Sequence, residues 1–122
     1  MKTFTLRQEH LDSFDAMYRE TFEDRMVRDI AERFYPQFEA MGEEKVRDRI
    51  CDGIERAARY EIHTQRDVAQ FIRLMFGIRP DFDTSRKTPF ASEILKQTDR
   101  PPMERLEEIK MIARREGVRQ PK

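Results

Sequence analysis

The chain has 122 residues; 38% are hydrophobic and 39% charged, and 24 basic residues balance 24 acidic ones. This is the length of one ordinary domain, and nine Phe with three Tyr supply core material that a disordered chain lacks. A zero net charge without a basic stripe excludes the usual pattern of a nucleic-acid binder, whose affinity rests on phosphate neutralisation. We therefore expect one folded domain over residues 1–122, with residues 118–122 as a frayed tail.

The same composition argues against secretion, a metal centre and a membrane span. Cys51 is the only cysteine, so it has no partner for an internal disulfide and offers no metal-ligand spacing. The start MKTFTLRQEHLD turns polar too early for a signal peptide. No apolar run approaches the roughly 20 residues that a membrane span needs. We expect a cytoplasmic protein with no membrane partner and no cofactor.

Apolar residues recur at helical spacing almost everywhere, beginning with one long stripe. Thr5 and Gln8 have the spacing of a capping box, so the first helix should start after Thr5. It should end before Pro36, because a helix interior does not tolerate proline. A short helical turn over Gln37–Met41 should then end at Gly42. The stripe of the first helix consists of Leu11, Phe14, Met17, Tyr18, Phe22, Met26, Ile30 and Phe34.

A second long helix is expected from Glu43 to about Tyr60, with Gly53 marking a close helix contact. Its buried stripe comprises Val46, Ile50, Ile54, Ala57 and Ala58. Its outer face carries three acid–base pairs at i,i+4 spacing, each contributing only about 0.2–0.5 kcal/mol. These pairs are Glu43–Arg47, Asp52–Arg56 and Glu55–Arg59.

Thr64 should cap a third helix, which ends at Gly77. Its segment VAQFIRLMF is apolar on nearly all sides, a pattern typical of a central helix packed from several directions. Residues 78–88 should form a loop. A fourth helix should begin at Pro89 with Thr88 as its cap, burying Phe90, Ile94 and Leu95. A last helix from Pro102 to Glu116 should bury Met103, Leu106, Ile109 and Ile112 and stop at Gly117. The predicted fold is all-α: a single compact bundle of five to six helices with a central apolar third helix.

No group of residues has the pattern of an active site, so we expect no catalytic residues and no small-molecule substrate. His10 and His63 are isolated, and Cys51 is better explained as a half-buried small residue than as a nucleophile. Asp81 and Asp83 could bind a cation, but Asp residues in such loops more often form Asx turns. Residues 43–77 vaguely resemble a helix-turn-helix. The helix after Thr64, however, is too apolar to read base edges, which leaves a DNA-binding regulator as a minor alternative.

The segments ARYEIHTQRDVAQFIRLMF and RPDFDTSRKTPFASEIL resemble a family of small helical proteins encoded beside effector genes of the bacterial type VI secretion system. Three positions depart from the family pattern: Glu61 and Arg79 stand where the family tends to have Gly, and Phe90 where it has Trp. With the first helix included, the resemblance covers most of the chain. The matching positions are Tyr60, Ile62, Asp67, Val68, Phe71, Ile72, Leu74, Met75, Phe76, Pro80, Phe82, Asp83, Pro89, Ala91, Ile94 and Leu95.

The resemblance implies a non-catalytic accessory protein: an adaptor or co-adaptor that helps an effector reach its spike. An immunity protein that binds and neutralises a toxin is the alternative. Both roles require a protein partner, and aromatic residues flanked by arginine are common at interface anchors. We therefore expect partner binding at the loop that leads into the fourth helix, with a second candidate at the first inter-helix turn. The two sets are Pro80, Phe82, Asp83, Arg86, Pro89 and Phe90, and then Phe34, Tyr35 and Phe38.

Overall fold

A computed structural model describes residues 22–117, which form six helices and no strand. The all-α prediction is confirmed. Residues 22–33 belong to the first helix, whose expected start and cap at Thr5 lie outside the described residues. The other five are α2 (Tyr35–Met41), α3 (Glu43–Arg59), α4 (Gln65–Gly77), α5 (Pro89–Leu95) and α6 (Pro102–Glu116).

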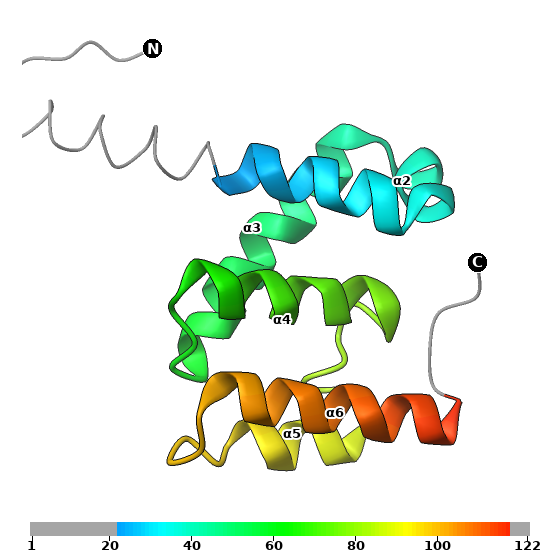
Figure 1. Cartoon of the computed structure of the whole chain (residues 1–122). Helices are drawn as coiled ribbons and strands as arrows, with labels where there is room; N and C mark the ends of the chain where they lie inside the picture. The colour runs from blue at the N-terminus through cyan, green and yellow to red at the C-terminus, as the bar shows by residue number, and fades with distance from the viewer. Residues whose placement is uncertain (1–21, 118–122) are drawn as a thin grey trace, which may run out of the picture.

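The helices are stacked in levels around α4. In Figure 1 the helix of residues 22–33 and α2 lie at the top, α4 in the middle, and α5 and α6 at the bottom. α3 crosses behind the top and middle levels, and α4 packs against both α3 and α6. Nine of the thirteen residues of α4 are buried, so its predicted central position is confirmed.

The local signals at most helix ends are confirmed. The first helix ends before Phe34. Pro36 lies in the first turn of α2, where backbone N–H groups have no partner within the helix, so the N–H that proline lacks is not needed there. Gly42 ends α2 with φ +87° and Gly117 follows α6 with φ +70°, both in the range that favours glycine. Thr64 Oγ1 accepts a hydrogen bond from the Asp67 backbone N–H at 3.2 Å, as an N-cap should.

Gly53 allows α3 to approach α4 closely. A Cβ built on Gly53 would lie 2.8 Å from Ile72 Cγ1 and 2.8 Å from Met75 Sδ. Both distances are shorter than ordinary van der Waals contact, so only hydrogen fits here. The predicted close helix contact is confirmed, and it is a contact with the central helix.

The buried face of α6 differs from the predicted stripe. Leu106 and Ile109 are buried as expected, whereas Met103 and Ile112 are only half-buried. Arg105 is 1% exposed and takes part of the place expected for apolar residues. The apolar spacing contained no sign of this buried cation.

The Arg105 guanidinium connects three segments through backbone carbonyls. It donates to the oxygens of Leu95 at 2.9 Å, Arg100 at 3.0 Å and Tyr60 at 3.1 Å. Leu95 ends α5 and Tyr60 directly follows α3, so two helix C-termini point their partial negative charge at this cation. Burial lowers the pKa of Arg105, and the three carbonyls replace the water that the guanidinium has lost.

Candidate partner-binding surface

The loop of residues 78–88 packs its aromatic residue into the core. Phe82 is fully buried, and its ring centroid lies 5.0 Å from that of Phe71 with the planes tilted by 55°. Thr88 Oγ1 donates to the Phe82 carbonyl at 2.8 Å and makes no capping bond to α5. Thr88 is the N-cap residue of α5, as predicted, but its hydroxyl binds the loop and not the helix. Phe82, which we expected to contact a partner, lies in the core. Burying the large phenyl ring is more favourable than exposing it.

Asp83 is also buried, at 2% exposed, and it binds two side chains at the end of α3. Arg56 donates to both of its carboxylate oxygens, and Tyr60 Oη donates to Oδ2 at 3.0 Å. Burial, followed by the negative charge of Asp83, raises the pKa of Tyr60 to about 12. Asp83 therefore anchors the loop to α3, and in this conformation it cannot contact a partner.

Asp81 and Asp83 point to different arginines and do not converge on a common point. Arg79 Nε donates to Asp81 Oδ1 at 2.7 Å, and this hydrogen bond lowers the pKa of Asp81. Within residues 22–117, no group of three or more His, Cys, Asp or Glu side chains is arranged to hold a metal ion.

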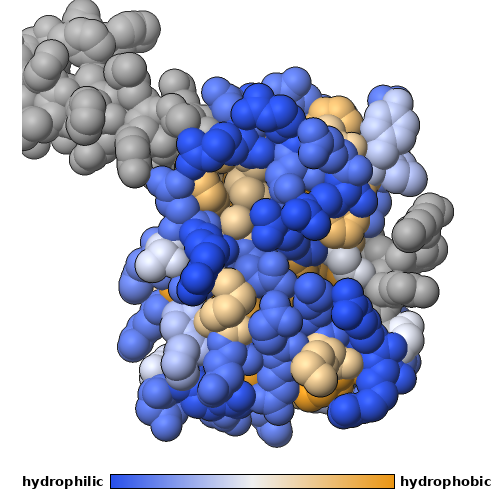
Figure 2. All heavy atoms as spheres, viewed as in Figure 1, coloured by the Kyte–Doolittle hydropathy of each residue, from blue (hydrophilic) through white to orange (hydrophobic). Residues whose placement is uncertain are grey.

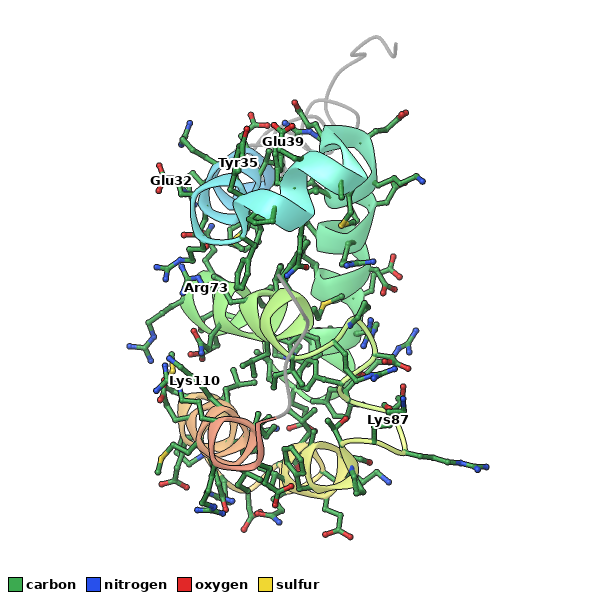
Figure 3. The ribbon with its side chains drawn as sticks, turned by 90° about the vertical axis from the view of Figure 1, so that its right-hand side faces the viewer. Glu32, Tyr35, Glu39, Arg73, Lys87 and Lys110 are labelled. Atoms are coloured by element: carbon green, nitrogen blue, oxygen red, sulfur yellow. The ribbon has the colours of Figure 1, made fainter. Side chains whose placement is uncertain are left out.

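The remaining predicted loop residues lie nearer the surface. Arg86 and Pro89 are exposed, Pro80 is half-buried, and Phe90 is half-buried against the core. Lys87 extends away from the loop into solvent (Figure 3). The exposed part of this loop is consequently polar and carries no exposed aromatic anchor.

The second predicted cluster is divided between core and surface. Phe34 stacks on Phe76 with centroids 5.9 Å apart, and Phe38 is half-buried against the core. Tyr35 is 56% exposed and lies close to Glu39 in Figure 3. A hydrogen bond to Glu39, with the charge of that carboxylate, raises the pKa of Tyr35. Of the three aromatic residues, Tyr35 is the exposed one, whereas Phe34 and Phe38 are half-buried.

His63 and Cys51, two of the isolated residues considered for chemistry, lie at the surface and half-buried in the packing, respectively. His63 is exposed in the turn before α4, and His10 lies outside the described residues. Cys51 is half-buried, as predicted, and its thiol donates to Glu23 Oε2 at 3.3 Å.

A groove that the sequence analysis missed lies where α2, α3 and the start of the loop meet. Met41 and Pro80 supply apolar walls, with the buried Met75 at the base, and Lys45 and Arg49 add positive charge. Asp48, Asp52, Arg56 and Ala40 complete the lining. We call this depression the Arg49 groove. It brings one predicted residue, Pro80, beside the end of α2.

Arg49 differs from its neighbours on α3. Its guanidinium carbon lies 5.3 Å from the centroid of the Phe76 ring, and within residues 22–117 no oxygen accepts a hydrogen bond from it. By contrast, Arg47 donates to Glu43 at 3.0 Å, and Arg56 donates to Asp52 at 2.8 Å. Burial lowers the pKa of Arg49, and the positive charge of Arg56 lowers it further.

A sequence signal for Arg49 did exist. The predicted pairs Glu43–Arg47 and Asp52–Arg56 form ion pairs, whereas Glu55–Arg59 forms none among the described residues. Arg49 has Lys45 four residues before it and Gly53 four residues after it, so it lacks an acidic i,i+4 partner. Its acidic neighbour at i,i+3 spacing, Asp52, is paired with Arg56 and accepts no hydrogen bond from Arg49.

The face of the molecule drawn in Figure 2 carries no large apolar patch. Figure 2 shows a largely hydrophilic surface on which apolar side chains emerge as separate spots. Large continuous apolar patches are the usual mark of an interaction surface, and this view contains none. No helix within residues 22–117 is long and apolar enough to cross a membrane.

Comparisons with family models, with curated proteins and with solved structures each yielded no match for this chain.

Proposed function

We propose that this chain is a non-catalytic, protein-binding accessory factor that assists the loading of a type VI secretion effector onto its spike. The observation that carries the binding role is the Arg49 groove, where apolar walls surround a guanidinium that donates no hydrogen bond within the described residues. The type of partner is inferred from the resemblance of residues 58–76 and 79–95 to accessory proteins of that secretion system.

The groove is built from parts that hold their positions without a partner. Gln37 of α2 donates to the Phe76 carbonyl of α4 at 2.9 Å, which fixes the short helix against the central one. The Arg56–Asp83 pair fixes the loop against α3. Binding to a preformed groove requires little ordering of the chain, which favours affinity.

Genetics in a bacterium that encodes the chain would test the adaptor role. Deleting its gene should reduce secretion of the neighbouring effector while leaving the effector's toxicity, when it is produced inside target cells, unchanged. The full chain should also co-purify with that effector or with a second adaptor. Unchanged secretion in the deletion strain, together with no co-purification, would remove the proposal.

The same strains distinguish an immunity protein from an adaptor. An immunity protein would bind the toxin domain itself and protect cells that produce the toxin. Protection by the chain alone, with normal effector secretion in the deletion strain, would replace the adaptor role by the immunity role.

A further inference from the structure

Arg49 is a charged group that is partly dehydrated and incompletely satisfied. Its side chain is half-buried, its guanidinium lies over the Phe76 ring, and Arg56 stands two helical turns away on the same helix. Burial, followed by the like charge of Arg56, disfavours the cation and lowers the pKa of Arg49, and the negative charge of Asp52 offsets only part of this effect. An added negative charge would offset both effects.

Within residues 22–117 the donor groups of Arg49 make no hydrogen bond, and its side chain is half-buried beside the Phe76 ring. A guanidinium held over an aromatic ring uses its planar face for the ring, and its N–H groups lie around its edge. Those N–H groups match the two oxygens of a carboxylate, and such two-pronged contacts are among the stronger hydrogen bonds in proteins. Lys45 on the same groove adds a second positive charge.

The other groups of the groove restrict what can bind there. Asp48 and Asp52 also line it, and they would repel a ligand that carries several negative charges, such as a phosphate chain. Asp52 is held by Arg56 at 2.8 Å. Met41 and Pro80 present apolar surface beside Arg49, which suits an aliphatic side chain. One carboxylate next to an apolar residue fits this arrangement.

We propose that the Arg49 groove binds a segment of a partner protein through one acidic side chain, Asp or Glu, flanked by an aliphatic residue. The acidic side chain pairs with Arg49, and the aliphatic residue lies against Met41 and Pro80. This inference deepens the proposed protein-binding function and rests on it.

A library of random 12-residue peptides displayed on phage, selected against the full chain, would test the inference. Enriched peptides should share an Asp or Glu beside an aliphatic residue. A synthetic copy of the best peptide should bind about tenfold more weakly to Arg49→Gln than to the unchanged protein, by fluorescence anisotropy. Replacing the peptide's acidic residue by its amide should cause a similar loss, with no further loss in Arg49→Gln.

Two variants control for folding and for charge. Arg59→Gln removes an exposed arginine of the same helix that does not line the groove, and it should bind like the unchanged protein. Arg49→Lys keeps the charge without the fork of donors and should show an intermediate affinity. Thermal unfolding of each variant shows whether a lost affinity reflects a lost fold.

Several results would overturn the inference. These are a library without enriched peptides, enriched peptides without an acidic residue, or equal binding by the unchanged protein and Arg49→Gln. Equal co-purification of the native effector by both proteins would also overturn it, while leaving the proposed adaptor role intact. A peptide that binds only when its C-terminal carboxylate is free, and not when it is amidated, would also overturn the inference. It would show that the ligand of Arg49 is a chain end and not an acidic side chain.

Discussion

Asp83 and Arg56 join the loop of residues 78–88 to α3 through a largely buried ion pair, with side chains 3% and 12% exposed. Tyr60 donates to the same carboxylate at 3.0 Å, and Asp52 accepts from the same guanidinium at 2.8 Å. Each charged or polar group in this set has a partner, which is the condition under which a buried charge is tolerated. The loop is thereby a fixed wall of the Arg49 groove.

Asp83→Asn should lower the free energy of unfolding by about 2–4 kcal/mol, because it removes the charge that offsets the burial of Arg56. Denaturant unfolding at neutral pH would measure the change. The matched control is Asp81→Asn in the same loop, where the carboxylate is exposed and should contribute at most about 1 kcal/mol. Equal effects of the two substitutions would contradict the structural role of Asp83.

Stability should fall as the pH rises from about 10 towards 12. The pKa of Tyr60 is about 12 in the folded chain, against 10.0 for an ordinary tyrosine. In this range the unfolded chain binds fewer protons than the folded one, so stability falls with increasing pH. Urea unfolding at pH 9 and pH 11.5 should show the loss, and Tyr60→Phe should make it smaller. Tyr35→Phe is the comparison: Glu39 also raises the pKa of Tyr35, but this phenol is exposed, so its removal should change the loss less than Tyr60→Phe does. A Tyr60 phenol that titrates near pH 10 by absorbance would refute the assignment.

Gly53→Ala should destabilise the chain by about 1–3 kcal/mol, because the new methyl group would press against Ile72 and Met75 at 2.8 Å. Gly77→Ala offers a close comparison on α4. Its Cβ would meet Phe34 at 3.7 Å, an ordinary contact, and alanine has the higher helix propensity. The second substitution should therefore be neutral or stabilising by up to about 1 kcal/mol. Thermal unfolding of both variants checks the difference, and a neutral Gly53→Ala would show that the two helices can move apart cheaply.

Glu61→Gly should be more stable than Glu61→Ala by about 1 kcal/mol. Glu61 follows the end of α3 with φ +63°, a conformation that a Cβ disfavours and that glycine adopts freely. Both substitutions remove the carboxylate near Arg105. The difference between their free energies of unfolding therefore reports the cost of the backbone conformation alone. Chemical unfolding of the two variants measures this difference. Equal stabilities would mean that the residue is not held in the left-handed region in solution.

Arg105→Leu should cost about 3 kcal/mol or more, although leucine is the more hydrophobic residue. The substitution leaves the buried carbonyls of Tyr60 and Leu95 without the donor that reaches them. Leu106→Met on the same helix keeps an apolar side chain of similar volume and should cost less than about 1.5 kcal/mol. Circular dichroism during urea unfolding would compare the two. A stable Arg105→Leu variant would show that water or a neighbouring group can satisfy these carbonyls.

The amino-acid sequence by itself determined the helical class, the order of the helices and the central place of α4. These features follow from local rules: the spacing of apolar residues, the cap at Thr64 and the glycines at positions 42 and 117. A hydrogen bond between Thr64 and Asp67, or a positive φ at a glycine, involves residues that are close along the chain. Such interactions can be predicted without knowing which helices meet.

Only the tertiary structure decided which residues of the predicted surface are buried and where the Arg49 groove lies. Phe82 belongs to the core because Phe71, eleven residues earlier, lies beneath it. Arg105 is buried because the ends of α3 and α5 converge on it. Arg49 lies in a groove because Phe76, Met41 and Pro80 come together around it. Each of these environments depends on contacts between separate segments, which helical spacing does not encode.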